Sequence, residues 1–256
     1  MSNNKWSPYS PGKVEPTRIS RGKLDLFIEC PRCFYLDRRL GIKRPGLPGW
    51  SLNTAVDNLL KHEFDGYRAK KEIHPLMKKY NIDAIPFSHE DLPIWRDDIC
   101  QYVGASYVHK PTNLEICGIV DDIWVRPNGE LIIADYKATS TKKEFSLEDE
   151  YKQGYKKQAE TYQWIFRQNG FTVSETAYFV FANGIKDKDI FDGILEFEMS
   201  ILEHKGDDSW VEDTIYEIKK CLESDTLPEC NPECEHCAFR DKVNKVASVN
   251  PKYISV

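Results

Sequence analysis

The chain has 256 residues, of which 41% are hydrophobic, and its formal net charge is −6 at pH 7. This hydrophobic share is enough for a folded core, so the composition excludes a disordered chain and favours one large domain with extensions. The net acidity argues against a protein that coats nucleic acid over its whole surface. No apolar run approaches the length of a membrane span, and no secretory signal sequence is evident, so we expect a reducing, cytoplasmic setting.

The N-terminal part of the chain is predicted to be helical after a short tail. The first twenty residues are polar and contain several prolines, so we expect a flexible tail over residues 1–20. Hydrophobic periodicity predicts helices at about 22–40 and 52–70, and a proline-punctuated stretch continues to about 98. We therefore predict one domain over residues 21–242, with a helical insertion at about 50–98 and a C-terminal tail over 243–256.

Apolar and β-branched runs predict a mixed central sheet after this insertion. Its strands are expected at about 100–109, 114–126, 130–137 and 174–182, with an edge strand over Ile194–Ser200. A helix at about 150–168 connects the third and fourth strands, and a last helix over Asp208–Leu222 precedes the terminal cysteines. The predicted fold is thus α/β (α+β), with an αβββαβ core, an N-terminal helical extension and a C-terminal cysteine cluster.

Residues 118–137 are predicted to form a β-hairpin, because the turn sequence RPNG at 126–129 separates two apolar runs. Pro127 suits the second position of a type I turn, and Gly129 suits the left-handed position that follows. Together they predict a three-residue loop with a bulge, in which Arg126 pairs with Glu130. In this register, the numbers of any two residues that face each other across the hairpin add up to the same value, as 126 and 130 do.

This register brings three ionisable side chains to one face of the hairpin. Asp121 lies opposite Asp135, and Lys137 shares their face because residues two apart on a strand point the same way. Asp122 lies on the other face, opposite Ala134, which is why we choose Asp121. A two-residue Asn-Gly loop would reverse that choice.

Two carboxylates at this separation repel each other unless a cation lies between them. Oxygen ligands suit Mg²⁺ or Mn²⁺, and a neighbouring lysine can stabilise an anion or a metal-bound water. Phosphodiester hydrolysis needs such a site, because water must be activated and the charge on the phosphorane neutralised. The alternative interpretation is a surface hairpin with an acidic pair across the strands and a solvated lysine.

The hairpin resembles that of the PD-(D/E)XK nuclease superfamily, specifically its RecB-like branch. In that branch a G-x-x-D strand precedes a D/E-x-K strand, and the matching residues are Gly118, Asp121, Asp135 and Lys137. The resemblance implies a restriction-endonuclease-like fold and a metal-dependent nuclease that acts on DNA. It also implies that a Q-x-x-x-Y motif on the next helix, here Gln158 and Tyr162, helps to place the metal site and the nucleic-acid strand.

The resemblance departs from the family pattern at the upstream helix, where the family usually has a metal-binding histidine. Asp57 takes its place and could still bind a metal, because a carboxylate suits Mg²⁺ better than imidazole does. His62 is an alternative ligand, although it lies on a different stripe of the helix. The residues expected on the buried face of this helix are Leu52, Val56, Leu59, Leu60 and Phe64.

Five of the eight cysteines lie in two clusters, one near each end of the chain. The first is C-x-x-C at Cys30 and Cys33, and the second, at 230–237, holds Cys230, Cys234 and Cys237. In a reducing compartment, paired C-x-x-C motifs indicate a metal site more often than disulfides. Four thiolates are enough for Zn²⁺ or a [4Fe-4S] cluster.

The sequence around the first pair, CPRCFYL, resembles the cysteine context of iron-sulfur RecB-like nucleases. Those members often use one upstream and three downstream cysteines, so Cys33 and Cys230 compete for the fourth ligand position. The symmetry of the two C-x-x-C pairs favours Cys30, Cys33, Cys234 and Cys237, with Cys230 in reserve.

The leading hypothesis is an Mg²⁺-dependent deoxyribonuclease that acts on single- or double-stranded DNA in repair, recombination or defence, with room for protein partners and no membrane association. An alternative is a catalytically degenerate nuclease fold that serves as a nucleic-acid-binding or scaffolding subunit. A third hypothesis is a zinc-stabilised interaction module in which the acids of the hairpin are incidental.

Overall fold

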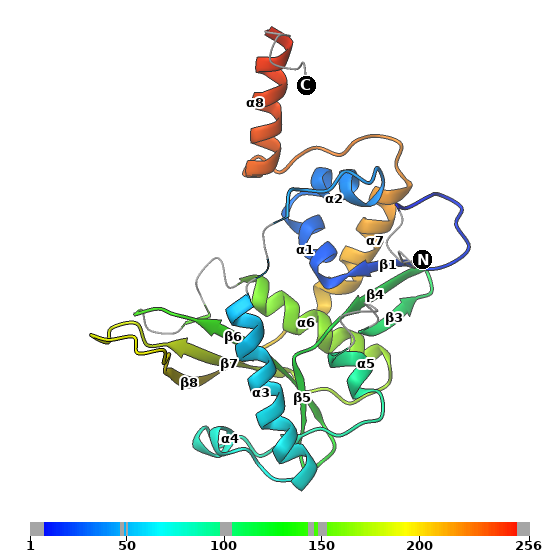
Figure 1. Cartoon of the computed structure of the whole chain (residues 1–256). Coiled ribbons are helices and arrows are strands. Elements are labelled where there is room, and N and C mark those ends of the chain that lie inside the picture. The colour runs from blue at the N-terminus through cyan, green and yellow to red at the C-terminus, as the bar shows by residue number, and fades with distance from the viewer. Residues whose placement is uncertain are drawn as a thin grey trace, which may run out of the picture. The chain divides into compact units, whose positions relative to one another are not determined.

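The computed structural model describes residues 8–46, 49, 51–97, 104–142, 146–147 and 153–249. The chain divides into two units (Figure 1). We call them the cysteine unit, which comprises Met1–Leu47, Val108–Glu115 and Glu212–Val256, and the sheet unit, which comprises Pro48–Tyr107 and Ile116–Val211.

The sheet unit contains a five-stranded mixed sheet with the order β2-β5-β6-β7-β8. Its strands are β2 (Ile85–Pro86), β5 (Asp122–Val125), β6 (Leu131–Thr139), β7 (Thr176–Gly184) and β8 (Phe197–Lys205). Strands β6 and β7 are parallel, and the other neighbours are antiparallel. A parallel pair needs a crossover connection, which is supplied by helix α6 (Gln153–Gln168). The predicted mixed α/β fold is therefore confirmed.

Helices α3 and α6 contact opposite faces of this sheet. Helix α3 (Ser51–Lys70) buries Phe64 against Trp124 and Tyr136, whose even numbers place them on one face. On the odd-numbered face, Phe179 of β7 lies against Tyr155 of α6, with ring centroids 6.3 Å apart. Short helices α4 (Pro75–Lys79) and α5 (Leu92–Arg96) precede and follow β2 in the chain.

The buried face of α3 is narrower than predicted. Val56, Leu60 and Phe64 are buried, as expected, and are spaced four residues apart. The expectation was wrong for Leu52 and Leu59, which are 59% and 67% exposed. One stripe at i, i+4 and i+8 is enough to cover the aromatic centre of the sheet, so the second stripe faces solvent.

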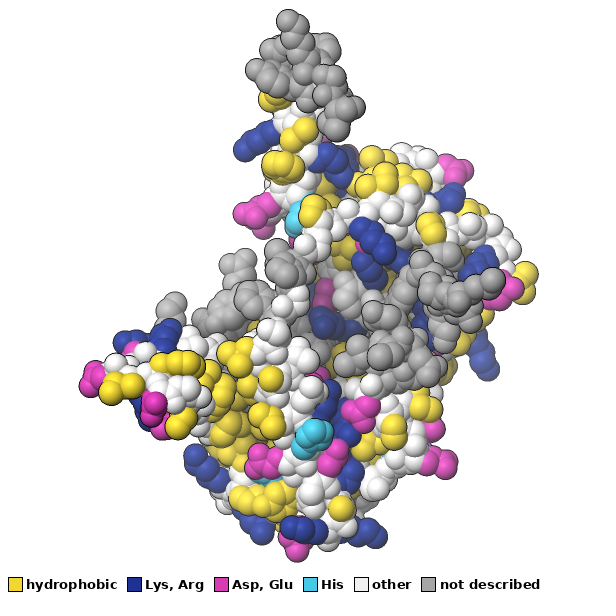
Figure 2. Space-filling model, viewed as in Figure 1, with side chains coloured by type: hydrophobic (Ala, Val, Ile, Leu, Met, Phe, Trp, Pro, Cys, Tyr) yellow, Lys and Arg dark blue, Asp and Glu magenta, His cyan; other side chains and the backbone are white. Residues whose placement is uncertain are grey.

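The cysteine unit is mainly helical. It contains strand β1 (Thr17–Ser20), helices α1 (Arg21–Glu29), α2 (Pro31–Arg38) and α8 (Glu235–Val249), and most of α7 (Ser209–Glu223). The single helix predicted at 22–40 is interrupted at Cys30, because Pro31 has no N–H and begins a new helix instead. Helix α7 buries Ile215, Ile218 and Leu222. Helix α8, by contrast, exposes Phe239, Val243 and Val246 beside basic side chains (Figure 2).

Several predicted boundaries need correction. The N-terminal tail ends earlier than expected, since β1 begins at Thr17, and α8 occupies residues 235–249, which include part of the expected C-terminal tail. The strand predicted over 114–126 is two strands, β4 (Leu114–Gly118) and β5, which belong to different sheets. The second sheet has the order β1-β4-β3, so β3 (Ala105–His109) is not part of the central sheet, and residues 100–103 lie outside the described residues.

Strands β3 and β4 each have residues in both units. In the described part of the chain, no helix combines the length and the apolar character that crossing a membrane requires.

Candidate active site and thiolate cluster

The hairpin turn has the predicted geometry. The Arg126 N–H donates to the Glu130 carbonyl at 2.9 Å, and the Gly129 N–H donates to the Arg126 carbonyl at 2.9 Å. Gly129 has φ of +85°, the left-handed conformation that favours glycine. Asp122 pairs with Ala134 and Val125 with Leu131, so the predicted register is confirmed.

Asp121 lies one residue before β5, on the side of the hairpin that carries Asp135. Its Oδ2 accepts a hydrogen bond from the Tyr136 N–H at 2.8 Å. The Asp135 side chain is 1% exposed, and this burial is the main cause that raises its pKa to about 7. The charge of Asp121 raises this pKa further, whereas Lys137 opposes the shift.

Lys137 forms an ion pair with Asp135. Its Nζ also lies 4.8 Å from the ring centroid of Tyr155, within cation–π range. Burial alone would lower the pKa of Lys137, but the charges of Asp135 and Asp121 outweigh burial and raise it. Lys137 is therefore held as a cation between the two aspartates and an aromatic face.

The carboxylates of this site fit a hard divalent cation, and Asp135 shows this most clearly. Asp135 Oδ1 is buried and has no hydrogen-bond partner among the described residues. A buried carboxylate oxygen without a partner is costly, and a bound cation would remove that cost. The carboxylate oxygens of Asp57, Asp121 and Asp135 are not, however, all within 4.8 Å of one another.

Asp57 lies on α3 within electrostatic reach of this site. Its pKa is raised by burial and then by the charge of Asp121, while Lys61 and Lys137 lower it. Its Oδ2 forms an ion pair with Lys61 at 2.9 Å, and its Oδ1 is buried without a hydrogen-bond partner in the described chain. His62, the alternative metal ligand on this helix, lies near Asp65 and helps to lower the pKa of that carboxylate.

Tyr162 reaches the segment that leads to Asp121, and Gln158 lies beside the Tyr162 hydroxyl. The Tyr162 hydroxyl donates to the Ile119 carbonyl at 2.7 Å, and Gln158 Nε2 lies 3.5 Å from that hydroxyl. Gly118 makes room for the tyrosine, because a Cβ atom at Gly118 would lie 2.5 Å from Tyr162 Cε1. The glycine of one motif and the tyrosine of the other thus fit together.

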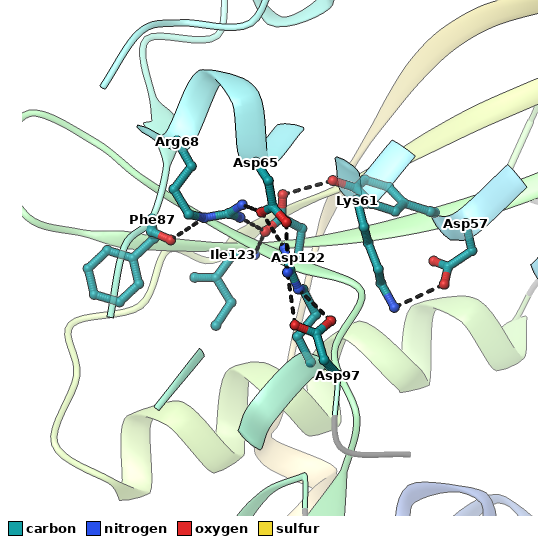
Figure 3. A network of polar contacts seen from close by, with 10 residues as sticks. Asp57, Lys61, Asp65, Arg68, Phe87, Asp97, Asp122 and Ile123 are labelled. Carbon is teal, nitrogen blue, oxygen red and sulfur yellow. Dashed lines mark hydrogen bonds and ion pairs between the residues drawn. The ribbon is translucent and has the colours of Figure 1, made fainter. Parts of the chain in front are cut away.

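Asp122 belongs to a different network on the opposite face (Figure 3). It is fully buried, forms an ion pair with Arg68 and accepts a 2.8 Å hydrogen bond from the Tyr136 hydroxyl. Arg68 also pairs with Asp65, which Arg96 contacts at 2.7 and 2.9 Å. This network ties α3 to the hairpin and leaves Asp122 with a structural role.

The sequence did not predict the roles of two polar residues of α6, of which Tyr155 lies at the site and Glu160 packs against β8 and α7. Tyr155 contacts Lys137. The sequence pattern that could have identified it is an aromatic residue three positions before Gln158, on the same stripe of the predicted helix. Glu160 lies inside the Q-x-x-x-Y motif, where it accepts hydrogen bonds from His204 at 2.8 Å and Trp210 at 2.7 Å. Burial raises the pKa of Glu160, but these hydrogen bonds outweigh it and lower the pKa.

The cysteine unit brings four thiols together. Among the described residues they are the only group of three or more histidine, cysteine or acidic side chains whose ligand atoms all lie within 4.8 Å of one another: Cys30, Cys33, Cys234 and Cys237. Cys230, Cys117 and Cys221 lie outside this group, and Cys100 lies outside the described residues. The cluster fits a thiophilic metal, because all four members are buried and free of disulfides.

Basic and backbone donors surround the sulfurs. Arg44 Nη2 lies 3.3 Å from Cys234 Sγ, and Arg240 Nη2 lies 3.2 Å from Cys237 Sγ. Burial raises the pKa of Cys30, but hydrogen bonds with backbone groups of Cys33 and Asn231 outweigh it and lower the pKa to about 7. For Cys33 and Cys237, by contrast, burial and the neighbouring thiols raise the pKa, so metal binding would have to displace their protons.

Comparison with protein-family models matches residues 18–241 to the PD-(D/E)XK nuclease superfamily. A search of curated proteins returns no match. The matched segment covers most of the chain, including the hairpin, α6 and all four clustered cysteines. The chain therefore belongs to the PD-(D/E)XK nuclease superfamily.

Proposed function

We propose that the protein is a metal-dependent nuclease of the RecB-like branch that hydrolyses phosphodiester bonds in DNA. The observation that carries this proposal is the buried Asp135, whose Oδ1 has no hydrogen-bond partner among the described residues. It lies on the same hairpin face as Asp121 and Lys137, which is the arrangement that phosphodiester hydrolysis needs.

Asp121 and Asp135 would hold Mg²⁺ or Mn²⁺, with Asp57 as an additional ligand. When bound, the ion would polarise a phosphate oxygen and lower the pKa of a bound water. Asp57 would bind the ion through Oδ1, which has no hydrogen-bond partner among the described residues, while its Oδ2 keeps the 2.9 Å ion pair with Lys61.

Lys137 would orient the attacking water and stabilise the negative charge that develops on the phosphorane. Its raised pKa keeps it protonated at neutral pH, which favours this electrostatic role over proton abstraction. The face of Tyr155 restricts the ammonium group to the side of the hairpin where the two aspartates lie.

Gln158 and Tyr162 would act on the metal site through the backbone. The hydroxyl of Tyr162 holds the Ile119 carbonyl, two residues before Asp121. Fixing this segment limits the positions that the Asp121 carboxylate can occupy, which keeps the ligand geometry ready for the ion.

We also propose that the cysteine unit is a metal-bound part of the same nuclease, because the family match runs through both units. Zn²⁺ and [4Fe-4S] are the two cofactors that four thiolates allow. Roles in DNA repair, recombination or defence are consistent with this assignment, and protein partners in such a complex are part of the proposal.

The experiment is cleavage of end-labelled single- and double-stranded DNA in Mg²⁺ or Mn²⁺, with free and blocked ends. We expect Asp135→Asn and Lys137→Ala to lose cleavage while their unfolding midpoints show that they fold. Asp187→Asn is a matched control, because Asp187 is an exposed carboxylate that also pairs with a lysine, Lys142. Equal cleavage by the wild type and both site variants would refute the proposal.

The second candidate is a degenerate nuclease fold that binds or scaffolds nucleic acid without cleaving it. It is favoured by Asp57 in the family's histidine position and by the ion pair that occupies this carboxylate. Titration with Mn²⁺, followed by the loss of the free-ion EPR signal, separates the two candidates. Binding that Asp121→Asn abolishes supports the enzyme, whereas no binding by the wild type supports the degenerate fold.

A further inference from the structure

We propose that the four clustered cysteines bind one tetrahedral Zn²⁺ ion and not an iron-sulfur cluster. This inference rests on the proposed metal-binding role of the cysteine unit, and it is independent of whether the hairpin site cleaves DNA. The ligands would be Cys30, Cys33, Cys234 and Cys237.

The separations between sulfur atoms carry the argument. Sγ of Cys30 lies 3.7 Å from that of Cys237, and Sγ of Cys33 lies 3.7 Å from Cys234 and 3.6 Å from Cys237. A Zn–S bond of about 2.3 Å in a regular tetrahedron places the sulfurs roughly 3.8 Å apart. An iron-sulfur cluster puts a cage of iron and sulfide between the thiolates, which holds them much farther apart than one ion does.

The charges around the cluster suit a bound metal, although four thiolates around a [4Fe-4S]²⁺ core carry the same net charge, so the choice of Zn²⁺ rests on the sulfur separations. Four thiolates and one Zn²⁺ carry a net charge of −2, which is unfavourable in a buried site unless it is compensated. The guanidinium groups of Arg44 and Arg240 lie 3.3 and 3.2 Å from two of the sulfurs. Arg44 shares its charge with Glu29, which it contacts at 2.7 Å, so Arg240 supplies the larger part of the compensation. These arginines would be positioning residues that stabilise the thiolates without binding the ion.

The site has the features of a structural ion rather than a catalytic one. All four ligands come from the protein and are buried, so a tetrahedral ion would have no open position for water or substrate. Cys30 and Cys33 lie at the junction of α1 and α2, while Cys234 and Cys237 lie at the start of α8. One ion would therefore join these two parts of the cysteine unit.

Helix α8 depends on that junction because it has little else to hold it. Among its described side chains only Cys237 is buried, and Phe239 is 71% exposed. Hydrophobic burial scales with the apolar area removed from water, so packing contributes little to the placement of this helix. The metal–sulfur bonds at the first turn of α8 would therefore be its main link to α1 and α2.

The test is elemental and spectroscopic analysis of full-length protein purified without oxygen from cells supplied with both zinc and iron. We expect one zinc per chain, no acid-labile sulfide and no visible absorption band, and we expect Co²⁺ substitution to give the visible bands of tetrahedral thiolate coordination. Iron with sulfide, a single iron ion, or no metal at all would overturn the proposal. Asp135→Asn serves to keep the two proposals apart, because it is expected to retain the zinc even though it loses cleavage.

Variants locate the ligands and test the arginines. Cys237→Ser is expected to lose the zinc, while Cys230→Ser, outside the cluster, is expected to keep it. Arg240→Gln should weaken zinc binding by about 10- to 100-fold in competition with a chromophoric chelator, as outer partners of metal ligands commonly do. Lys242→Gln on the same helix is the matched control for charge. Equal zinc affinity of Arg240→Gln and Lys242→Gln would refute the charge argument.

Discussion

The close fit between Gly118 and Tyr162 predicts a specific energetic coupling between two motifs. In Gly118→Ala the new Cβ would lie 2.5 Å from Tyr162 Cε1. Ordinary contacts begin at 3.4 Å, so the ring or the strand must move by 0.9 Å (3.4 − 2.5). Overpacking of this kind costs about 1–3 kcal/mol. Displacement of the ring also puts at risk the 2.7 Å hydrogen bond to Ile119, which is worth about 0.5–1.5 kcal/mol.

Urea unfolding of a double-mutant cycle measures this coupling. We expect Gly118→Ala to destabilise the wild type by roughly 2 kcal/mol, and to cost much less in a Tyr162→Ala background, where the ring is gone. Gly154→Ala is the control, because a Cβ atom there meets nothing within 4 Å. Metal binding should weaken in Gly118→Ala as the segment before Asp121 shifts. An equal cost of Gly118→Ala in both backgrounds would show that the two motifs do not interlock.

Three further outcomes are expected. Asp122→Ala should lower the free energy of unfolding by about 1–3 kcal/mol, since it leaves the buried Tyr136 hydroxyl without its acceptor and Arg68 with Asp65 but not Asp122 as a carboxylate partner. Asp121→Ala should cost far less, and similar losses in urea titrations would contradict the separation of roles. In Mg²⁺-free buffer, the wild type should lose stability relative to Asp135→Asn as the pH rises from about 4 to 7. The reason is that the pKa of Asp135 rises from 3.8 to about 7 on folding, so the folded protein retains a proton that the unfolded chain has lost. Parallel pH profiles of the two proteins in urea melts would argue against this shift. Removal of the thiolate-bound metal should speed tryptic cleavage after Lys242 in α8, as measured by mass spectrometry, and an unchanged rate would show that other contacts hold the helix.

The hairpin was predictable because its determinants are local. Pro127 and Gly129 impose backbone angles that few other loops share, and the loop type then sets the register of both strands. From the register alone, Asp121 and Asp122 could be assigned to opposite faces, and the structure has them there. The four clustered cysteines could likewise be chosen from the two local C-x-x-C spacings, and Cys230 lies outside the group.

The features that the sequence could not reveal depend on distant contacts. Residues 114–126 contain enough apolar and β-branched residues to be predicted as one strand, yet the strand ends at Gly118, where the Tyr162 ring of α6 packs. Arg68, the partner of Asp122, lies 54 positions away and leaves no local pattern. The exposure of Leu59 likewise follows from the width of the surface that α3 covers, which periodicity does not measure.

The pair of adjacent aspartates at the start of β5 has a consequence for how this hairpin can change over evolutionary time. A one-residue insertion or deletion in the turn would slide one strand past the other and exchange the faces of Asp121 and Asp122. An acid would still point toward the metal side, so the chemistry would survive the slip. In the slip that carries Asp122 to the place of Asp121, however, Ile123 would take the place of Asp122, and Arg68 would lose that carboxylate. We therefore expect turn length to be constrained by folding stability rather than by the need for a metal ligand.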